Sequence, residues 1–167
     1  QYILVCTCAS TKFIIAKAYE QANSESTANF ILEQISRYGT PKFIHSDRGS
    51  HFVNSTIKKI CEKFNIIHLV STAYHPESQA YTERCNQTLK QCLTNYISQN
   101  FDNWSDLLPF VTFSINSTPH SRLKFPPFYL VHGYLPNLPI DNEVMSQIKP
   151  FNIVKSVEAL QKVRNDI

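Results

Sequence analysis

The hydrophobic pattern of residues 1–70 switches repeatedly between the strand period and the helix period, and this alternation restricts the chain to an α/β fold. Two β-branched runs separated by a polar turn come first, and helical patterns then alternate with short strands. The predicted elements are strands 1–8 and 12–19, a helix over 24–38, a strand over 42–46, a helix from residue 54 or 55, and a strand over 66–70. A hairpin followed by helix–strand pairs predicts a mixed sheet flanked by helices.

A carboxylate follows the third predicted strand. Asp47 comes directly after residues 42–46, and Gly49 permits the chain to leave the sheet in a tight turn. Because sites in open α/β sheets form at the carboxyl ends of strands, Asp47 is a candidate site residue. Glu83 lies near the start of a long helix predicted over 80–98. Two carboxylates on rigid elements, far apart in sequence, are what a metal site requires.

The long predicted helix has two different faces. Its buried face is predicted to contain Cys85, Leu89, Cys92, Leu93 and Tyr96. A second face places Glu83, Gln87, Lys90 and Thr94 in a row at helical spacing. A carboxylate for a cation beside an ammonium for phosphate suits a nucleic-acid surface, and a solvated polar face is the alternative.

Three further segments follow the long helix. Residues 104–116 predict a helix with a kink or an early turn at Pro109, and residues 127–133 predict a short helix. A polar connector then leads to an amphipathic segment over 152–164. The pattern contains no internal repeat.

Composition bounds the function only loosely. A chain of 167 residues suits one domain with a sizeable core, and a net charge of +3 is too small to identify a polyanionic partner. The five cysteines are odd in number and include no Cys-x-x-Cys pair, which favours reduced core thiols over zinc ligands or disulfides. No run reaches transmembrane length and no signal peptide is recognisable, so we expect an intracellular protein.

A series of short motifs resembles a known family. In order, the motifs are Tyr2-Ile3-Leu4-Val5, His45-Ser46-Asp47-Arg48-Gly49-Ser50-His51-Phe52, Thr72-Ala73-Tyr74-His75-Pro76, Glu83-Arg84-Cys85-Asn86-Gln87-Thr88-Leu89, Trp104-Ser105-Asp106-Leu107-Leu108-Pro109, Asn116-Ser117-Thr118-Pro119-His120, Pro127-Phe128-Tyr129-Leu130-Val131-His132-Gly133 and Leu138-Pro139-Ile140-Asp141. This set resembles the catalytic core of retroviral-type integrases, and most closely those of Ty3/Gypsy long-terminal-repeat retrotransposons. The resemblance covers residues 1–141, expected to form the core domain, and leaves residues 142–167 as a connector with a C-terminal helical segment.

The resemblance implies an RNase H-like fold, with a five-stranded mixed sheet flanked by helices. It implies that three acidic residues hold two divalent cations, Mg²⁺ or Mn²⁺, for the cleavage and strand transfer of DNA. Asp47 matches the family's second acid and Glu83 the third, so both are expected to be catalytic metal ligands. The implied partners are the element's DNA ends, target DNA and further copies of the chain, with no membrane, and the implied place of action is the nucleus.

DNA contacts are expected around these two acids. The candidates are Lys90, Asn86, Gln87, Tyr74 and His75. Lys90 shares the helix face of Glu83, whereas Gln87 replaces the family's basic residue one turn after the glutamate, which weakens one phosphate contact. Tyr74 and His75 precede the helix and either contact DNA or fix the loop.

The family's first acid lies on a first strand upstream of Tyr2, and residues 1–46 contain no aspartate. Glu20, Glu25 and Glu33 come too late in the sequence to match it. We therefore expect an N-terminally truncated core that lacks the central strand of its sheet. Since each unpaired backbone group in a core costs about 1–3 kcal/mol, the hypothesis is that this chain alone is neither catalytic nor stably folded.

Two other functions stay open at this point. One is a decayed or domesticated integrase-like chain that binds DNA or a protein partner without catalysis. The other is a nuclease of the same fold that cuts RNA in hybrids, although the motifs from Trp104 to Asp141 favour an integrase.

Overall fold

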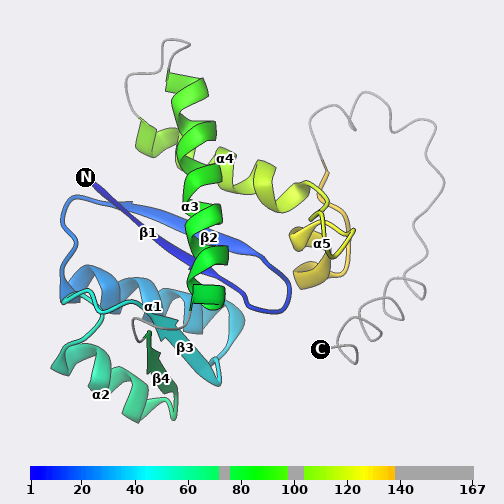
Figure 1. Ribbon diagram of the computed structural model, residues 1–167. Coiled ribbons are helices and arrows are strands. Elements are labelled where there is room, and N and C mark those ends of the chain that lie inside the picture. The colour runs from blue at the N-terminus through cyan, green and yellow to red at the C-terminus, as the bar shows by residue number, and fades with distance from the viewer. Residues whose placement is uncertain (72–75, 98–103, 138–167) are drawn as a thin grey trace, which may run out of the picture. The chain divides into compact units, whose positions relative to one another are not determined.

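The computed structural model describes residues 1–71, 76–97 and 104–137 (Figure 1). Its elements are β1 (Tyr2–Thr7), β2 (Ile14–Tyr19), α1 (Ser24–Tyr38), β3 (Phe43–Ser46), α2 (Ser55–Lys63), β4 (Ile67–Val70), α3 (Pro76–Ile97), α4 (Trp104–Ser117) and α5 (Pro127–His132). This order confirms the predicted α/β class. The amphipathic segment predicted over 152–164 and the division at residue 141 lie outside the described residues. In the three described ranges, no helix combines the length and the apolar character needed to cross a membrane.

The described strands pair in two separate two-stranded sheets. β1 and β2 form a hairpin, while β3 and β4 run parallel with Phe43 opposite Ile67 and Ser46 opposite Val70. The five-stranded mixed sheet implied by the resemblance is therefore not formed among the described residues. A central strand that would join the two pairs, which the resemblance places upstream of Tyr2, is not one of the four described strands.

α1 has the bounds that the sequence pattern predicts because both of its ends are capped. Asn23 precedes the helix, and its side-chain oxygen accepts a hydrogen bond from the Ser26 N–H at 2.8 Å. Gly39 follows the helix with a φ of 84°, and its N–H donates to the Ile35 carbonyl at 2.9 Å. A residue with a Cβ is strained at this φ, so Gly39 determines where the chain turns toward β3.

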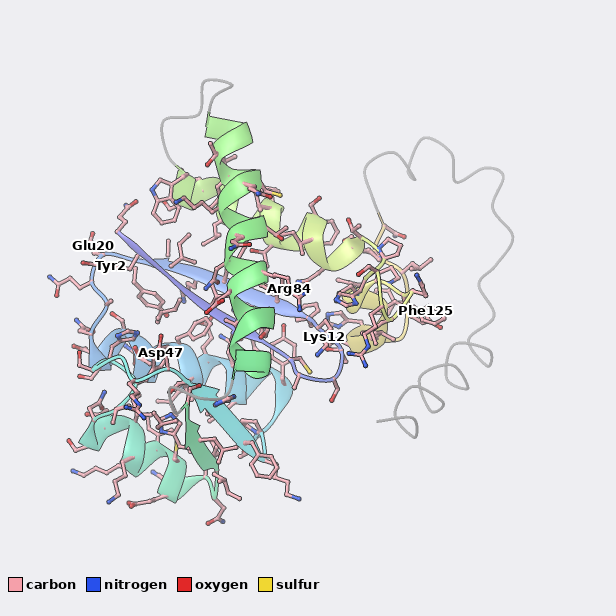
Figure 2. All side chains as sticks on the ribbon, viewed as in Figure 1. Tyr2, Lys12, Glu20, Asp47, Arg84 and Phe125 are labelled. Carbon is pink, nitrogen blue, oxygen red and sulfur yellow. The ribbon has the colours of Figure 1, made fainter. Side chains whose placement is uncertain are left out.

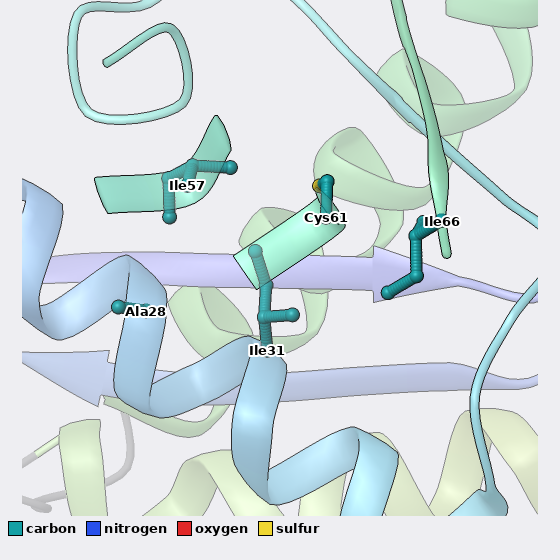
Figure 3. Close-up of a cluster of buried hydrophobic side chains, with 5 residues drawn as sticks. All are labelled: Ala28, Ile31, Ile57, Cys61 and Ile66. Atoms are coloured by element: carbon teal, nitrogen blue, oxygen red, sulfur yellow. The ribbon is translucent and has the colours of Figure 1, made fainter. Parts of the chain in front are cut away.

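A hydrophobic cluster joins α1, α2 and the residue before β4 (Figure 3). It consists of Ala28, Ile31, Ile57, Cys61 and Ile66. Ile57 is fully buried, and Ile44 of β3 packs against the cluster. Because truncating a buried isoleucine to alanine costs about 2–5 kcal/mol, this cluster is a main source of stability for the β3–β4 sheet and its two helices.

α1 also contacts the hairpin. The Lys17 Nζ of β2 donates to the Glu33 Oε2 at 2.8 Å, and Arg37 forms a second ion pair with the same carboxylate. The hydrogen bond from Lys17 lowers the pKa of Glu33. The Tyr19 and Phe30 rings meet edge to face with their centroids 6.5 Å apart. α1 therefore connects β2 with the core that carries the β3–β4 sheet.

The chain divides into two compact units. They are Gln1–Val5 with Ala16–Leu108, and Cys6–Ile15 with Pro109–Ile167. In the second unit, Asn116 of α4 makes two hydrogen bonds with the backbone of Ile14. Its Oδ1 accepts from the Ile14 N–H at 2.8 Å, and its Nδ2 donates to the Ile14 carbonyl at 2.7 Å. This buried amide satisfies the edge of β2 as a neighbouring strand would.

Two sequence-based expectations differ from the structure. α3 begins at Pro76, about four residues before its predicted start, because a proline in the first turn loses no helical hydrogen bond and already has a helical φ. The thiols of Cys61 and Cys85 are buried as predicted, but Cys6 and Cys8 are exposed. The latter two lie at the turn end of the hairpin, where a strand leaves the core.

Candidate functional site

Asp47 lies where the sequence predicts it, one residue beyond β3 (Figure 2). The residue is exposed, and its Oδ1 accepts a hydrogen bond from the Gly49 N–H at 2.8 Å. In such a turn the aspartate side chain bonds to the backbone two residues later, which fixes the direction of the carboxylate. The local sequence alone therefore orients the candidate ligand.

Gly49 leaves room at this turn for two neighbouring side chains. It is not among the glycines with a positive φ, which are Gly39 and Gly133. A Cβ at position 49 would lie 2.6 Å from the His51 Cε1 and 2.9 Å from the Asp47 Oδ1. The tight exit predicted after Asp47 is thus associated with the missing Cβ of Gly49 and not with a positive φ. His51 lies against this glycine beside the aspartate, and the sequence pattern does not predict it as a site residue.

Two histidine–serine hydrogen bonds hold the end of β3 beside β4. The Ser46 Oγ lies 2.9 Å from the His68 Nε2, and the His45 Nε2 lies 2.9 Å from the Ser71 Oγ. Because successive residues of a strand point to opposite faces, the two bonds lie on opposite faces of the sheet. Burial and, to a smaller extent, the nearby His45 lower the pKa of His68, so this ring is neutral at pH 7.

Two further hydrogen bonds fix the residues that follow β3 and β4. The Arg48 Nε–H donates to the carbonyl of the buried Ser71 at 3.1 Å, and the Ser46 hydroxyl donates to the Asp47 carbonyl at 2.9 Å. Sequence reasoning misses these partners. Strand periodicity predicts that β3 and β4 exist, but only their register brings each histidine within reach of a serine that lies two residues beyond its direct partner.

α3 presents the predicted polar face. Its exposed residues include Glu83, Asn86, Gln87, Lys90 and Thr94. Cys85, Leu89 and Leu93 are buried on the other side, whereas Cys92 is only half-buried. Helical spacing therefore brings the carboxylate of one turn and the ammonium two turns later onto one accessible face. Tyr74 and His75, the other two predicted contacts, lie outside the described residues.

Asp47 and Glu83 belong to the same compact unit and stand on separate elements. Carboxylate oxygens are the ligands that Mg²⁺ prefers, so both side chains suit such an ion. In the described part of the chain, however, no three His, Cys, Asp or Glu residues gather into a group that could hold a metal. Among the described residues, Asp47 and Glu83 are therefore not joined by a third such side chain.

Known proteins resemble both the sequence and the fold. Residues 1–76 match the family model of the integrase core domain. Over 164 residues the chain is 28% identical to the retrovirus-related Pol polyprotein from transposon 412 of Drosophila melanogaster, covering 98% of this chain and 12% of the polyprotein. The chain thus resembles integrase cores, and the family model matches its first 76 residues. The transposon Tf2-3 polyprotein of Schizosaccharomyces pombe is 29% identical to this chain over 156 residues, covering 92% of the chain and again 12% of the polyprotein.

Solved structures share the fold of this chain. The catalytic core domain of BIV integrase aligns with a TM-score of 0.67 at 23% identity, covering 86% of this chain and 88% of that one. A chain of the simian T-cell lymphotropic virus intasome in complex with PP2A regulatory subunit B56 gamma aligns at 0.69 and 24% identity, covering 90% and 52%. The HTLV-2 integrase catalytic core domain in complex with magnesium, in a trimeric form, aligns at 0.67 and 18% identity, covering 78% and 84%. These likenesses confirm the predicted RNase H-like fold.

Proposed function

We propose that this integrase core binds the DNA ends of a retrotransposon and contributes ligands for the metal-dependent cleavage and joining of DNA. The observation that carries the proposal is the position of Asp47 at the carboxyl end of β3 in an integrase core, together with the exposed Glu83 of α3. The relatives are transposon polyproteins, of which this chain spans about an eighth, so the activity is proposed for the longer protein. Its place of action is the nucleus, where the target DNA is.

Asp47 and Glu83 would hold divalent cations through their carboxylate oxygens. When bound, two such ions activate an attacking hydroxyl and stabilise the leaving oxygen of a phosphodiester. The contribution of this chain is to position the ligands. The Gly49 N–H orients the first carboxylate, and the histidine–serine bonds hold the strand that precedes it. Such rigidity matters because ligands must stay within about 0.5 Å of the productive geometry.

The exposed face of α3 is the proposed contact surface for the DNA end. Lys90 lies two turns beyond Glu83 on this face, where its ammonium can neutralise a phosphate beside the metal ligand. Asn86 and Gln87 can donate to phosphate or sugar oxygens from their amides. Tyr74 and His75, which precede α3 in the sequence and lie outside the described residues, are further proposed contacts.

We propose that the third acidic ligand comes from a strand beside β3, supplied from outside the present sequence. The Lys42 and Ser46 carbonyls accept hydrogen bonds from the β4 side at 3.1 and 2.9 Å. The backbone groups of Phe43 and His45 alternate with these and therefore point to the other edge of β3. Among the described residues, no strand pairs with that edge. An acidic residue at the end of such a strand would lie near Asp47.

Divalent cations and self-association follow from the same proposal. Mg²⁺ or Mn²⁺ is the cofactor that two carboxylates and a phosphodiester would share. One structural relative was solved with magnesium in a trimeric form and another within an intasome. We therefore propose that this integrase core acts as a homo-oligomer on DNA.

A non-catalytic integrase-like chain that binds DNA or a protein partner is the second candidate function. The observation in its favour is that the described residues contain no group of three metal-binding side chains. A protein of this kind would keep the polar face of α3 and bind DNA without joining it.

Strand transfer with synthetic element-end DNA and Mn²⁺ tests the proposal. In the complete integrase of the element, Asp47→Asn and Glu83→Gln are each expected to abolish joining while DNA binding is retained. Joining that survives both substitutions would contradict the assignment of these ligands. DNA binding without joining by the complete integrase would favour the second candidate.

The isolated 167-residue chain provides a separate test of the added strand. It is expected to give no joined product with either Mg²⁺ or Mn²⁺. Joining by this chain alone would refute the added strand and leave the roles of Asp47 and Glu83 intact.

A further inference from the structure

Five aromatic rings of the second compact unit form one connected group, called the ring cluster below. Its members are Phe13, Phe113, Phe128, His132 and Tyr134. Between centroids, the Phe128 ring lies 6.0 Å from the Phe113 ring and 5.5 Å from the Tyr134 ring. The His132 ring lies 4.3 Å from Phe128 and 5.7 Å from Phe13. Because each ring contacts at least one other, the five side chains form a single surface.

The ring cluster has a base that is shielded from solvent and a rim that is exposed. Phe13 is buried and Phe128 is half-buried. Tyr134 is 55% exposed, Phe113 is 37% exposed, and His132 is exposed as well. An exposed ring that its neighbours already hold in place loses little conformational entropy when a planar ligand stacks on it. The rim is therefore suited to stacking on planar groups.

Two turns of the second unit share one backbone pattern. In residues 8–13 and 120–125, the first N–H donates to the sixth carbonyl, at 2.9 and 3.0 Å, and the fifth N–H donates to the first carbonyl, at 3.0 and 2.7 Å. The fifth residue of both turns is a lysine in the left-handed region, Lys12 with a φ of 62° and Lys124 with a φ of 63°. Glycine and asparagine adopt this region more readily, so the backbone does not explain a lysine at either position.

The sixth residue of each turn is a phenylalanine that packs against α5 (Figure 2). The Phe13 ring meets His132 edge to face at 5.7 Å between centroids, and the Phe125 ring stacks on Tyr129 at the same distance. Two turns that are far apart in the sequence therefore place a lysine beside the same short helix.

The described part of the second unit contains no acidic side chain. In residues 6–15 and 109–137 the sequence has three basic residues, Lys12, Arg122 and Lys124, and neither Asp nor Glu. The whole chain has 16 basic and 13 acidic residues, so its net charge of +3 equals the charge of this part alone. A surface with charge of one sign repels a second copy of itself and attracts a polyanion. The charge therefore favours a nucleic acid over self-association.

Exposed rings beside cations are the combination that binds single-stranded nucleic acid. Unpaired bases stack on the rings and the cations neutralise phosphates, whereas the bases of a duplex are not accessible for such stacking. Arg122 and Lys124 are exposed. Lys124 is four residues before Phe128, so the Cα atoms of these two residues lie at most about 14 Å apart. A strand of several nucleotides can therefore reach both the cations and the rings.

We propose that the ring cluster, together with Arg122 and Lys124, binds single-stranded DNA. The rings and cations suit a single strand of either DNA or RNA, and the choice of DNA rests on the proposed function. The site lies in the second unit, apart from the face of α3 and from Asp47 and Glu83 of the first unit. Binding is therefore measured without divalent cations, so that its outcome does not depend on strand transfer.

Fluorescence anisotropy of the complete integrase with a labelled oligo(dT) of about 15 nucleotides tests the rings. Tyr134→Leu keeps an apolar side chain but removes the ring, and it is expected to weaken binding about fivefold or more. Tyr134→Phe keeps the ring and should bind as the parent protein does. Tyr38→Leu, at an exposed tyrosine of the first unit, should leave the affinity unchanged. Equal affinities for Tyr134→Leu and the parent would overturn the proposal.

Lys124→Gly tests the cations without adding backbone strain. The substitution removes one positive charge at a φ that glycine adopts freely, so the slope of log Kd against log salt should fall by about 0.7. Asn65→Gly makes the same backbone change at a left-handed residue of the first unit, and Lys59→Ala removes an exposed cation of α2. Both controls should keep the parent's slope. An unchanged slope in Lys124→Gly would contradict the proposed phosphate contact.

Photo-crosslinking with 5-iodouracil in the oligonucleotide locates the bound bases. Crosslinks to Phe113, His132 or Tyr134 are the expected products. Crosslinks confined to other residues, or binding of oligo(U) without binding of oligo(dT), would overturn the proposal. A dimer that Tyr134→Leu disrupts while oligo(dT) affinity is unchanged would assign the ring cluster to self-association and refute it equally.

Discussion

The Ser46 Oγ lies 2.9 Å from the His68 Nε2, across the parallel pair of β3 and β4 and one residue before Asp47. The hydroxyl also donates to the Asp47 carbonyl, so its oxygen is the acceptor for an imidazole N–H. This bond joins the strand that delivers the candidate ligand to the strand beside it. The bond between His68 and Ser46 is a long-range contact that supports the backbone beside Asp47. The Gly49 N–H, in contrast, sets the direction of the Asp47 carboxylate locally.

The stability of the chain is expected to depend on pH through His68. Its folded-state pKa is lowered from 6.5, mainly by burial, so the unfolded chain binds a proton first as the pH falls. His68 therefore makes its full contribution to the unfolding free energy above about pH 6.5. This contribution is lost as the pH falls below that value toward the folded-state pKa. Urea unfolding of the complete integrase at pH 7.5 and 5.5 should show a larger loss of unfolding free energy in the parent protein than in His68→Gln. His132→Gln, at an exposed histidine, should keep the parent's pH dependence.

Gly49→Ala is expected to disturb the candidate metal ligand. The new Cβ would lie 2.6 Å from the His51 Cε1 and 2.9 Å from the Asp47 Oδ1, so both side chains must rotate away, and the carboxylate loses its present direction. Calorimetric Mn²⁺ titration of the complete integrase should show weaker binding, and adding His51→Ala should restore part of it.

Gly39→Ala is the matched control for this glycine. Its φ is 84° and no atom lies within 4 Å of the position that the alanine methyl group would occupy, so only backbone strain of about 1 kcal/mol is expected. Mn²⁺ binding should not change. Equal Mn²⁺ affinities for Gly49→Ala and the parent protein would show that the turn does not position the carboxylate.

Asn116→Leu is expected to destabilise the second unit. The substitution leaves the N–H and the carbonyl of Ile14 buried without their partner, at about 1–3 kcal/mol for each group. Urea unfolding should show a loss of about 2–5 kcal/mol, whereas Asn29→Ala on the exposed side of α1 should change stability by less than about 0.5 kcal/mol. A loss for Asn116→Leu no larger than for the control would mean that the edge of β2 is rehydrated.

Lys90→Glu is expected to weaken the binding of element-end DNA. Loss of one phosphate contact should lower the salt dependence of log Kd by about one unit, largely regardless of sequence. Fluorescence anisotropy over a series of salt concentrations measures this slope. Lys59→Glu makes the same charge change at an exposed position of α2 and is the control. Identical slopes for the two variants would remove Lys90 from the DNA surface.

Much of the fold follows from local signals. The helical period and the flanking Asn23 and Gly39 predict α1 with the bounds that it has. The sequence pattern places the start of α3 too late because a polar stretch that contains Pro76 resembles a loop, although proline is favoured in the first turn of a helix. The end of a helix is misplaced in this way where the same local sequence is compatible with both a loop and a helix.

The candidate site was predictable only in part. Strand and helix periods are encoded in neighbouring residues, so the amino-acid sequence predicts that Asp47 follows a strand and that Glu83 and Lys90 share a helix face. The bond from His68 to Ser46, the contact of Asn116 with the edge of β2, and the arrangement of the described strands in two separate pairs are visible only in the folded chain. These relationships depend on strand register and on packing between segments far apart in the chain, and no local pattern specifies either.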